Sequence, residues 1–329
     1  MKMTQVSEMG ERSLVNLLSG MFNSDFNTDL VLGPGSDDCA VLDISDGDYL
    51  VVTTDMLHSK TDFPEQMTPW QIGWMSAAVN LSDVASMGAR PIGILMAIGM
   101  SSDTPVSFVK EMARGMSDCA KACGTTVIGG DIDTHDELTI TGTALGLVKK
   151  SRLLKRKGAN AGDRVCVTGF TGSAGAALHA LQHGIDVPDS FLNTLLEPCP
   201  RVAEGQALAR SGAVTCMMDT SDGLAMSLHD LADINGVGFH ICESMLPVCQ
   251  DMKDYVTSEP EEQTDFALYT GGDFELLFTV SPEKLEEARN ACDLSIIGEV
   301  VGKTAGIRIE RNHGTNLSIN RKGYLQLGT

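Results

Sequence analysis

The sequence PWQIGWMSAAVNLSDVASMGARP, residues 69–91, decides the fold of the first half of this 329-residue chain. Pro69 and Gly88 are typical of the first turn and the end of an α-helix, so we predict a helix between them. Apolar side chains surround most of its circumference, namely Ile72, Trp74, Met75, Ala77, Ala78, Val79, Leu81 and Ala85. A helix with this pattern is buried on most sides, which makes the carboxylate of Asp83 conspicuous.

Patterns typical of strands and helices alternate on both sides of this helix. Before it, we predict an amphipathic helix over 11–21 and a hairpin of strands at 39–43 and 49–54. After it, strands at 91–98, 125–128 and 138–148 accompany a helix over 106–120. Further on, the predicted strands are 164–168, 214–218 and 275–280, and the predicted helices are 173–183, 201–210 and 224–233. The pattern indicates a mixed α/β (α+β) fold.

A change of composition near residue 155 divides the chain. A basic run over 149–157 leads into the turn-rich residues 158–163. We therefore predict an N-terminal domain over 1–155 and a C-terminal domain over 156–329.

Charge and hydropathy exclude several classes of protein. Lys and Arg number 24 against 44 for Asp and Glu, a net charge of −20, which repels nucleic acid and anionic membranes. The longest apolar stretch, near 91–100, is about half of the roughly 20 residues that a membrane span needs. We predict a soluble, cytoplasmic protein with no nucleic acid or membrane partner.

The nine cysteines contain no CxxC pair, so we expect reduced thiols that pack as small core residues. Cys119 with Cys123, and His179 with His183, lie four residues apart on predicted helices. Either pair could share a metal ion on one helical face, but no nearby ligands complete such a site.

Five short acidic motifs combine carboxylates with glycine or hydroxyl residues, at residues 35–38, 53–55, 80–83, 129–131 and 219–223. Taken singly, each is more typical of a turn or helix cap than of a ligand site. Their context favours the ligand interpretation, because Asp55 and Asp131 follow apolar strands and Asp83 lies in a buried helix. Carboxylate and hydroxyl oxygens without His or Cys suit Mg²⁺, so the set predicts a magnesium site for a phosphorylated ligand.

Glycines and cations offer further phosphate contacts. Residues 129–130 would let the backbone approach a phosphate, as would residues 169–175 at the start of a helix. Arg156 and Lys157 could neutralise phosphate charge, and an exposed linker is the alternative interpretation of this basic run. Residues 302–304 resemble the end of a P-loop, but the spacing is one residue short and a strand follows instead of a helix.

The motifs together resemble the thiamine-monophosphate kinase family, within the superfamily of aminoimidazole ribonucleotide synthetase. The resemblance follows chain order through SDDCAVL (36–42), TTDML (53–57), AVNLSDVASMGARP (78–91), IGGD (128–131), GDRVCVTG (162–169), DTSDGL (219–224) and GGDFELLF (271–278). The segments NLSDVASMGA and KGY (322–324) favour the kinase within that superfamily.

The resemblance implies an N-terminal domain whose four-stranded sheet forms a homodimer interface, a C-terminal α/β domain, and active sites in the clefts between them. It also implies transfer of the γ-phosphoryl group of ATP to thiamine monophosphate, giving thiamine diphosphate. The implied ligands of several Mg²⁺ ions are Asp38, Thr53, Thr54, Asp55, Asp83, Asp131, Asp219 and Asp222. The implied ATP contacts are Gly130, Asp131, Arg156 and Ser221, and Tyr324 would contact the thiamine end.

Three positions depart from the family pattern. Asp62 stands where a His is frequent, so either it takes over a contact with the acceptor or this loop differs from that of the family. Gly272 occupies the place of the usual Glu, and Ser173 that of an Asp. The first two departures concern the acceptor pocket.

The acceptor phosphate, whose second pKa is near 6, is already mostly a dianion at pH 7, so we expect direct in-line transfer with no catalytic base and no covalent nucleophile. Two possibilities compete with this reaction: a related ATP-dependent enzyme with another substrate, and a non-catalytic regulatory protein that binds Mg²⁺ and nucleotide. Superfamily members with a reactive terminal Cys are disfavoured, because the cysteines here lie between residues 39 and 292.

Overall fold

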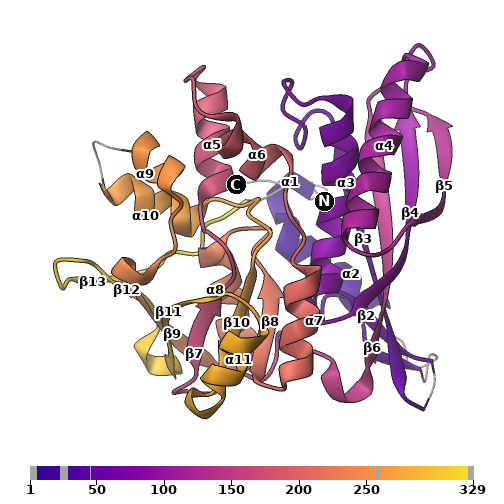
Figure 1. Ribbon diagram of the computed structural model, residues 1–329. Coiled ribbons are helices and arrows are strands. Elements are labelled where there is room, and N and C mark those ends of the chain that lie inside the picture. The colour runs from indigo at the N-terminus through magenta and orange to yellow at the C-terminus, as the bar shows by residue number, and fades with distance from the viewer. Residues whose placement is uncertain (1–5, 23–28, 45, 257–259, 325–329) are drawn as a thin grey trace, which may run out of the picture.

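A computed structural model describes residues 6–22, 29–44, 46–256 and 260–324 of the chain. Its strands form two mixed sheets, one in each half (Figure 1). The mixed α/β class predicted from the sequence is confirmed. Among the described residues, no helix combines the length and the apolar character needed to cross a bilayer.

The first sheet has six strands in the order β1-β2-β3-β6-β4-β5. Neighbouring strands are antiparallel except for β4 and β5, which are parallel. The strands are β1 (Leu30–Leu32), β2 (Ala40–Asp43), β3 (Asp48–His58), β4 (Arg90–Met100), β5 (Val127–Thr134) and β6 (Thr139–Lys149).

This sheet corrects two expectations. It has six strands instead of four, because the short strands β1 and β2 continue the ladder past β3. Strands β3 and β5 also run further than predicted, because each pairs with an 11-residue neighbour over its full length. As a result, Asp55 and Asp131 lie inside strands and not after them.

Helices α3 (Pro69–Ser86) and α4 (Val106–Ala122) pack together on one face of this sheet (Figure 1). A capping box fixes the start of α3: the Thr68 hydroxyl accepts from the Gln71 backbone N–H, and the Gln71 side chain accepts from the Thr68 N–H. Thirteen of the residues of α3 are buried, including Asn80, Ser82 and Ser86. The predicted burial of this helix is confirmed.

Two glycines set the distance between α3 and α4. A Cβ atom at Gly73 would lie 1.9 Å from the Met112 carbonyl oxygen, and one at Gly115 would lie 1.9 Å from that of Trp70. The two backbones therefore touch, and no larger residue fits at either position.

The second sheet has seven strands in the order β13-β12-β9-β11-β7-β10-β8, antiparallel except for β12 and β9. Its strands are β7 (Arg164–Val167), β8 (Val214–Asp219), β9 (Val237–Cys242), β10 (Leu276–Val280), β11 (Ser295–Gly302), β12 (Ile307–Glu310) and β13 (Asn316–Ser318).

The remaining helices belong to the second half, apart from two at the start of the chain, α1 (Val6–Met9) and α2 (Glu11–Phe22). Those of the second half are α5 (Ser173–Gln182), α6 (Asp189–Leu196), α7 (Val202–Ser211), α8 (Leu224–Asn235), α9 (Gln250–Tyr255), α10 (Pro260–Tyr269) and α11 (Leu285–Ala291), with 3₁₀ turns at 243–245, 282–284 and 303–305. A further 3₁₀ turn at 150–152 follows β6. The strand and helix predictions for this half are confirmed apart from small differences at their ends.

Helices α3 and α7 join the two halves. A Cβ atom at Gly205 on α7 would lie 2.2 Å from the Ala85 carbonyl oxygen on α3, and one at Gly88 would lie 2.5 Å from the Cβ of Ala209. One hydrophobic cluster spans this contact and includes Leu81, Met87 and Leu208. The division at residue 155 falls in the segment between the two sheets and stays a prediction.

The α3–α4 contact predicts a large effect of one methyl group. Replacing Gly73 with Ala forces the two helix backbones apart and should lower the free energy of unfolding by about 3 kcal/mol. Gly20→Ala, in α2 with no atom within 4 Å of the new methyl group, is the matched control and should raise stability by at most about 1 kcal/mol. Urea unfolding of both variants checks this; equal midpoints would contradict the close packing.

Candidate functional site

Three aspartates from distant segments meet between the two halves. Asp38 precedes β2, Asp83 lies on α3 and Asp219 ends β8. One carboxylate oxygen from each lies within 4.8 Å of the others. Among the described residues, no other three carboxylate, thiol or imidazole side chains lie close enough together to share a metal ion. Three of the five acidic motifs, at residues 35–38, 80–83 and 219–223, therefore converge in space.

Hydroxyl groups hold these carboxylates in place. Asp38 accepts a hydrogen bond from Ser86 (2.6 Å), Asp83 from Thr53, and Asp219 from Ser82 (2.6 Å) and Ser221 (3.0 Å). Three of these residues, Ser82, Asp83 and Ser86, lie on the same helix. Helix α3 therefore supplies one carboxylate directly and orients the two others.

Burial makes the ionised form of this cluster costly. Burial and the neighbouring Asp38 carboxylate raise the pKa of Asp219 to about 7. Burial, followed by Asp55 and Asp219, raises the pKa of Asp83 well above its usual range. Asp83 and Asp219 are therefore carboxyl groups that a bound divalent cation would ionise. The donors are all oxygen atoms, which suits Mg²⁺.

Arg156 is paired with one member of the cluster. Its Nε donates to an Asp38 oxygen at 2.9 Å, and its backbone N–H donates to Asp37 at 3.0 Å. Burial and the adjacent Asp38 raise the pKa of Asp37 to about 7. The end of the basic run is thus fixed against the site and is not an exposed linker at this residue.

Strand β3 places its side chains on alternate faces of the sheet. Thr53 and Asp55 face α3, and the Asp55 backbone N–H donates to the buried Asn80 side chain at 3.1 Å. Burial raises the pKa of Asp55 to about 6. Thr54 is exposed on the opposite face, where its hydroxyl bonds to the Gly142 carbonyl at 2.7 Å. The structure therefore does not bring the Thr54 side chain to the aspartates.

Asp131 also lies apart from the cluster. It is exposed on β5, the edge strand, and pairs with Ala97 of β4. Strands β4 and β6 separate β5 from β3, so Asp131 is three strand spacings, roughly 14 Å, from Asp55 across the sheet. Gly130 has a packing role here, because a Cβ atom would lie 1.9 Å from the Met96 carbonyl oxygen.

A cavity of about 750 Å³ extends from the aspartates. Asp55, Asp83, Asp219, Ser221 and Asp222 line it. So do the three residues predicted to contact the acceptor, Asp62, Gly272 and Tyr324. Its apolar lining includes Phe63, Met75, Leu178 and Phe274. The cavity is large enough for a small organic phosphate and offers both acidic and apolar walls.

Two segments far apart in the chain touch across this cavity. The Tyr324 hydroxyl donates to Asp62 at 3.2 Å, and the Tyr324 backbone N–H donates to the Asp222 carbonyl at 3.0 Å. Burial, followed by Asp62, raises the pKa of Tyr324 to about 12, so the phenol stays protonated. The last described residues therefore connect the acceptor wall to the loop that carries Asp222.

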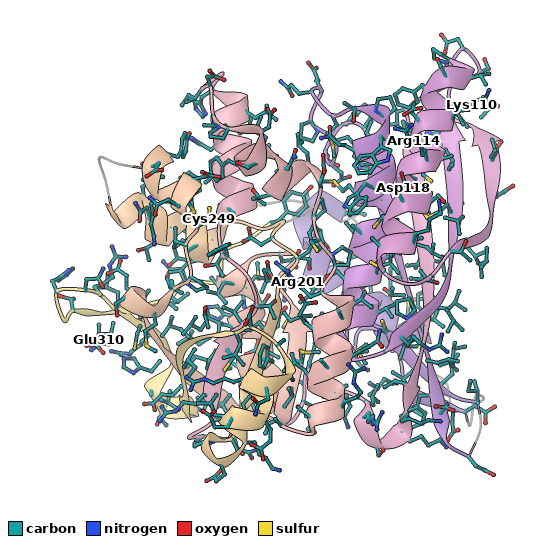
Figure 2. The ribbon with its side chains drawn as sticks, viewed as in Figure 1. Lys110, Arg114, Asp118, Arg201, Cys249 and Glu310 are labelled. Atoms are coloured by element: carbon teal, nitrogen blue, oxygen red, sulfur yellow. The ribbon has the colours of Figure 1, made fainter. Side chains whose placement is uncertain are left out.

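An ion pair anchors another wall. Arg201 lies between the halves of the molecule, next to the first turn of α7 (Figure 2). It donates to both oxygens of the buried Glu275, at 2.7 and 2.6 Å. The preceding residue, Phe274, has a φ of +52° and lines the cavity. A non-glycine residue in this conformation is strained, so the anchored loop holds its ring in position.

The start of α5 corrects one expectation. Its N-terminal amides do not face an open phosphate site, because Asp273 accepts from the N–H groups of Gly172 (2.6 Å) and Ala174 (3.0 Å). The Asp273 carboxylate thus occupies the N-terminal end of α5, where the glycine-rich sequence predicted a phosphate ligand.

The paired cysteines, the paired histidines and the P-loop-like segment gain no support as ligand sites among the described residues. Neither the Cys119–Cys123 pair nor the His179–His183 pair belongs to a group of three potential metal ligands. Residues 303–305 form a 3₁₀ turn before β12, unlike a P-loop.

The sequence predicted no role for Asp37, Ser86 or Arg12. Of these, Arg12 contacts Asp222 at 3.6 Å. The spacing of Ser86 three residues after Asp83 was the available signal for one of them.

Comparison with known proteins places these features in a family context. The family model described as AIR synthase related protein, N-terminal domain, matches residues 36–148, and its C-terminal counterpart matches residues 160–309. A thiamine-monophosphate kinase of Methanospirillum hungatei is 39% identical over 96% of this chain and 99% of its own length. The enzyme of Halobacterium salinarum is 36% identical over 92% of this chain and 96% of its own. A solved structure, "AaThiL complexed with AMPPCP and TMP", superposes with a TM-score of 0.87 and 26% identity, covering 99% of this chain and 100% of the other.

The raised carboxyl pKa values predict the pH dependence of stability. A carboxyl whose pKa is higher in the folded than in the unfolded protein stabilises the fold below its unfolded pKa, and this contribution is lost as the pH rises through the folded value. Without divalent ions, the free energy of unfolding should therefore fall by roughly 2–4 kcal/mol between pH 4 and pH 7.5, through Asp219 together with Asp83, Asp37 and Asp55. Excess Mg²⁺ should remove the decrease.

Urea unfolding in EDTA at several pH values measures this slope. Asp219→Asn should reduce it, whereas Asn at the exposed Asp103 should leave it unchanged. A stability that rises with pH in the metal-free wild type would contradict the interpretation of the cluster.

Proposed function

Because this chain belongs to the thiamine-monophosphate kinase family, we propose that it transfers the γ-phosphoryl group of ATP to thiamine monophosphate, forming thiamine diphosphate and ADP. The observation that carries the proposal is the convergence of Asp38, Asp83 and Asp219 beside a cavity lined by the predicted acceptor residues. The M. hungatei and H. salinarum relatives support the substrate, and the neighbour with AMPPCP and TMP supports the use of a nucleotide. We place the reaction in the cytoplasm.

The donor set fits Mg²⁺. Asp38, Asp83 and Asp219 would hold the ion, and Thr53, which bonds to Asp83, with Asp55 and Asp222, which line the cavity, would hold additional ions. When bound, magnesium neutralises phosphate charge that would otherwise repel these carboxylates. The hydroxyl groups of Ser82 and Ser86 preorganise the set by fixing one oxygen of Asp219 and of Asp38.

The other side chains bind and orient the two phosphorylated molecules. Arg156 and Ser221 lie at the aspartates and would contact ATP, and Asp62, Gly272 and Tyr324 would contact the thiamine end. The Asp62 carboxylate suits a cationic thiazolium ring. This attraction would explain why Asp can stand at a position where members of the family often have His. We propose direct transfer, because the acceptor needs no base and catalysis reduces to holding two anions in line.

We propose a homodimer in which Asp131 and Gly130 complete the partner's ATP site. Among the described residues, no helix covers the outer face of the first sheet, and Met56, Ile128 and Ile132 are more than half exposed there or on its edge strand. An apolar surface of this kind is typical of an interface between subunits. It also accounts for the separation of Asp131 from the cluster within one chain.

The proposed reaction predicts ADP release that depends on thiamine monophosphate. Asp83→Asn should abolish this release, by at least about 10³-fold, because it removes charge from the centre of the cluster. Its fold should persist, since the volume is unchanged. A coupled ADP assay with circular dichroism checks both, and Asn at the exposed Asp103 is the control.

Nucleotide binding without turnover would instead identify a regulatory protein. ADP release with thiamine monophosphate omitted, or a phosphorylated side chain trapped during turnover, would contradict direct transfer to this acceptor.

The shared site predicts complementation. Asp83→Asn and Asp131→Asn proteins should each be inactive, and unfolding and refolding them together should restore about a quarter of the wild-type activity, because half of the dimers then contain one intact site. Each variant refolded alone is the control. Failure to regain activity in a mixture shown to contain heterodimers would place Asp131 outside the partner's site.

A further inference from the structure

Helix α2 brings an arginine to the edge of the cavity. Arg12 lies in its first turn, next to Glu11, which lines the cavity. The Arg12 side chain is 36% exposed, so solvent and ligands can reach it. In Figure 1, α2 lies behind the junction of the two halves.

The two ion pairs of Arg12 differ in strength. Its Nη1 donates to Asp230 on α8, whose side chain is 16% exposed and which also faces Arg321 at 3.7 Å. Its Nη2 lies 3.6 Å from an Asp222 oxygen, too far for a good hydrogen bond. Asp230 therefore anchors one side of the guanidinium, and the other side makes a loose contact with Asp222, which lines the cavity.

The cavity is short of positive charge for a phosphorylated ligand. Seven of its lining residues are Asp or Glu, and one, Lys60, is basic. Lys60 is 77% exposed and pairs with Glu137 at 3.3 Å. Arg156 is engaged with Asp38. Arg12 contacts the lining residue Asp222, and among its described contacts its Nη2 has no acceptor closer than the 3.6 Å to Asp222.

We propose that Arg12 binds a phosphoryl oxygen of ATP or of the phosphorylated acceptor, with Asp230 as its positioning residue. The inference rests on the proposed function, because it assigns a residue to that same site. A guanidinium anchored by one carboxylate keeps its planar donor face directed at the ligand, which lowers the entropic cost of binding an anion.

Pairs of ligands with and without phosphate test this directly. Wild type and Arg12→Ala, as full-length proteins with Mg²⁺, are titrated calorimetrically with thiamine monophosphate and thiamine, and with AMPPCP and adenosine. We expect Arg12→Ala to weaken one phosphorylated ligand about tenfold while both phosphate-free ligands bind as before. The pair that changes identifies which phosphate Arg12 contacts. Arg12→Lys, which keeps the charge but not the planar face, should lose less.

The controls separate this role from a structural one. Arg164→Ala removes an arginine of similar exposure, which pairs with Glu299 at 3.0 Å in the second sheet, and should leave every affinity unchanged. Unchanged affinity of Arg12→Ala for both phosphorylated ligands overturns the inference. A loss of affinity for thiamine or adenosine as large as that for its phosphorylated counterpart also overturns it. A wild type that binds neither phosphorylated ligand overturns the proposed function as well.

Discussion

Repulsion among the carboxylates of Asp38, Asp83 and Asp219 is the constraint that the rest of the structure must overcome. Their mutual proximity and burial oppose folding in the absence of a cation, as the raised pKa values of Asp83 and Asp219 show. The apolar packing around α3 supplies the opposing free energy. The core thus stabilises the fold, whereas the carboxylate site destabilises it until a ligand binds, a division common in enzymes.

Helix α3 connects these two roles. One side of it buries apolar residues against the first sheet, against α4 and against α7. The other side carries Asn80, Ser82, Asp83 and Ser86, which contact β3, Asp219 and Asp38. Because both halves of the molecule pack on the same helix, the packing that forms the core also sets the distances between the carboxylates.

The sequence predicted much of this arrangement and failed in specific places. Hydrophobic periodicity and capping residues predicted α3 and most other elements, because they reflect local preferences. The ends of β3 and β5 depend on pairing partners far along the chain, which no local pattern reveals, so the placement of Asp55 and Asp131 was wrong. The alternation of β3 separates Thr54 from Thr53 and Asp55, and the capping of α5 by Asp273 is a contact across about 100 residues. Arg12 escaped notice because nothing in its neighbourhood resembles a motif.

The contact between α3 and α7 limits how the molecule can move. Gly205 places the backbone of α7 against the Ala85 carbonyl, and Gly88 admits the Ala209 methyl group, so neither helix can slide along the other without a steric clash. Any opening or closing of the two halves must then be a rotation about the α3–α7 contact. Ligand groups close to the axis would stay nearly fixed, whereas Tyr324 and Asp62, which belong to different halves, would part or meet.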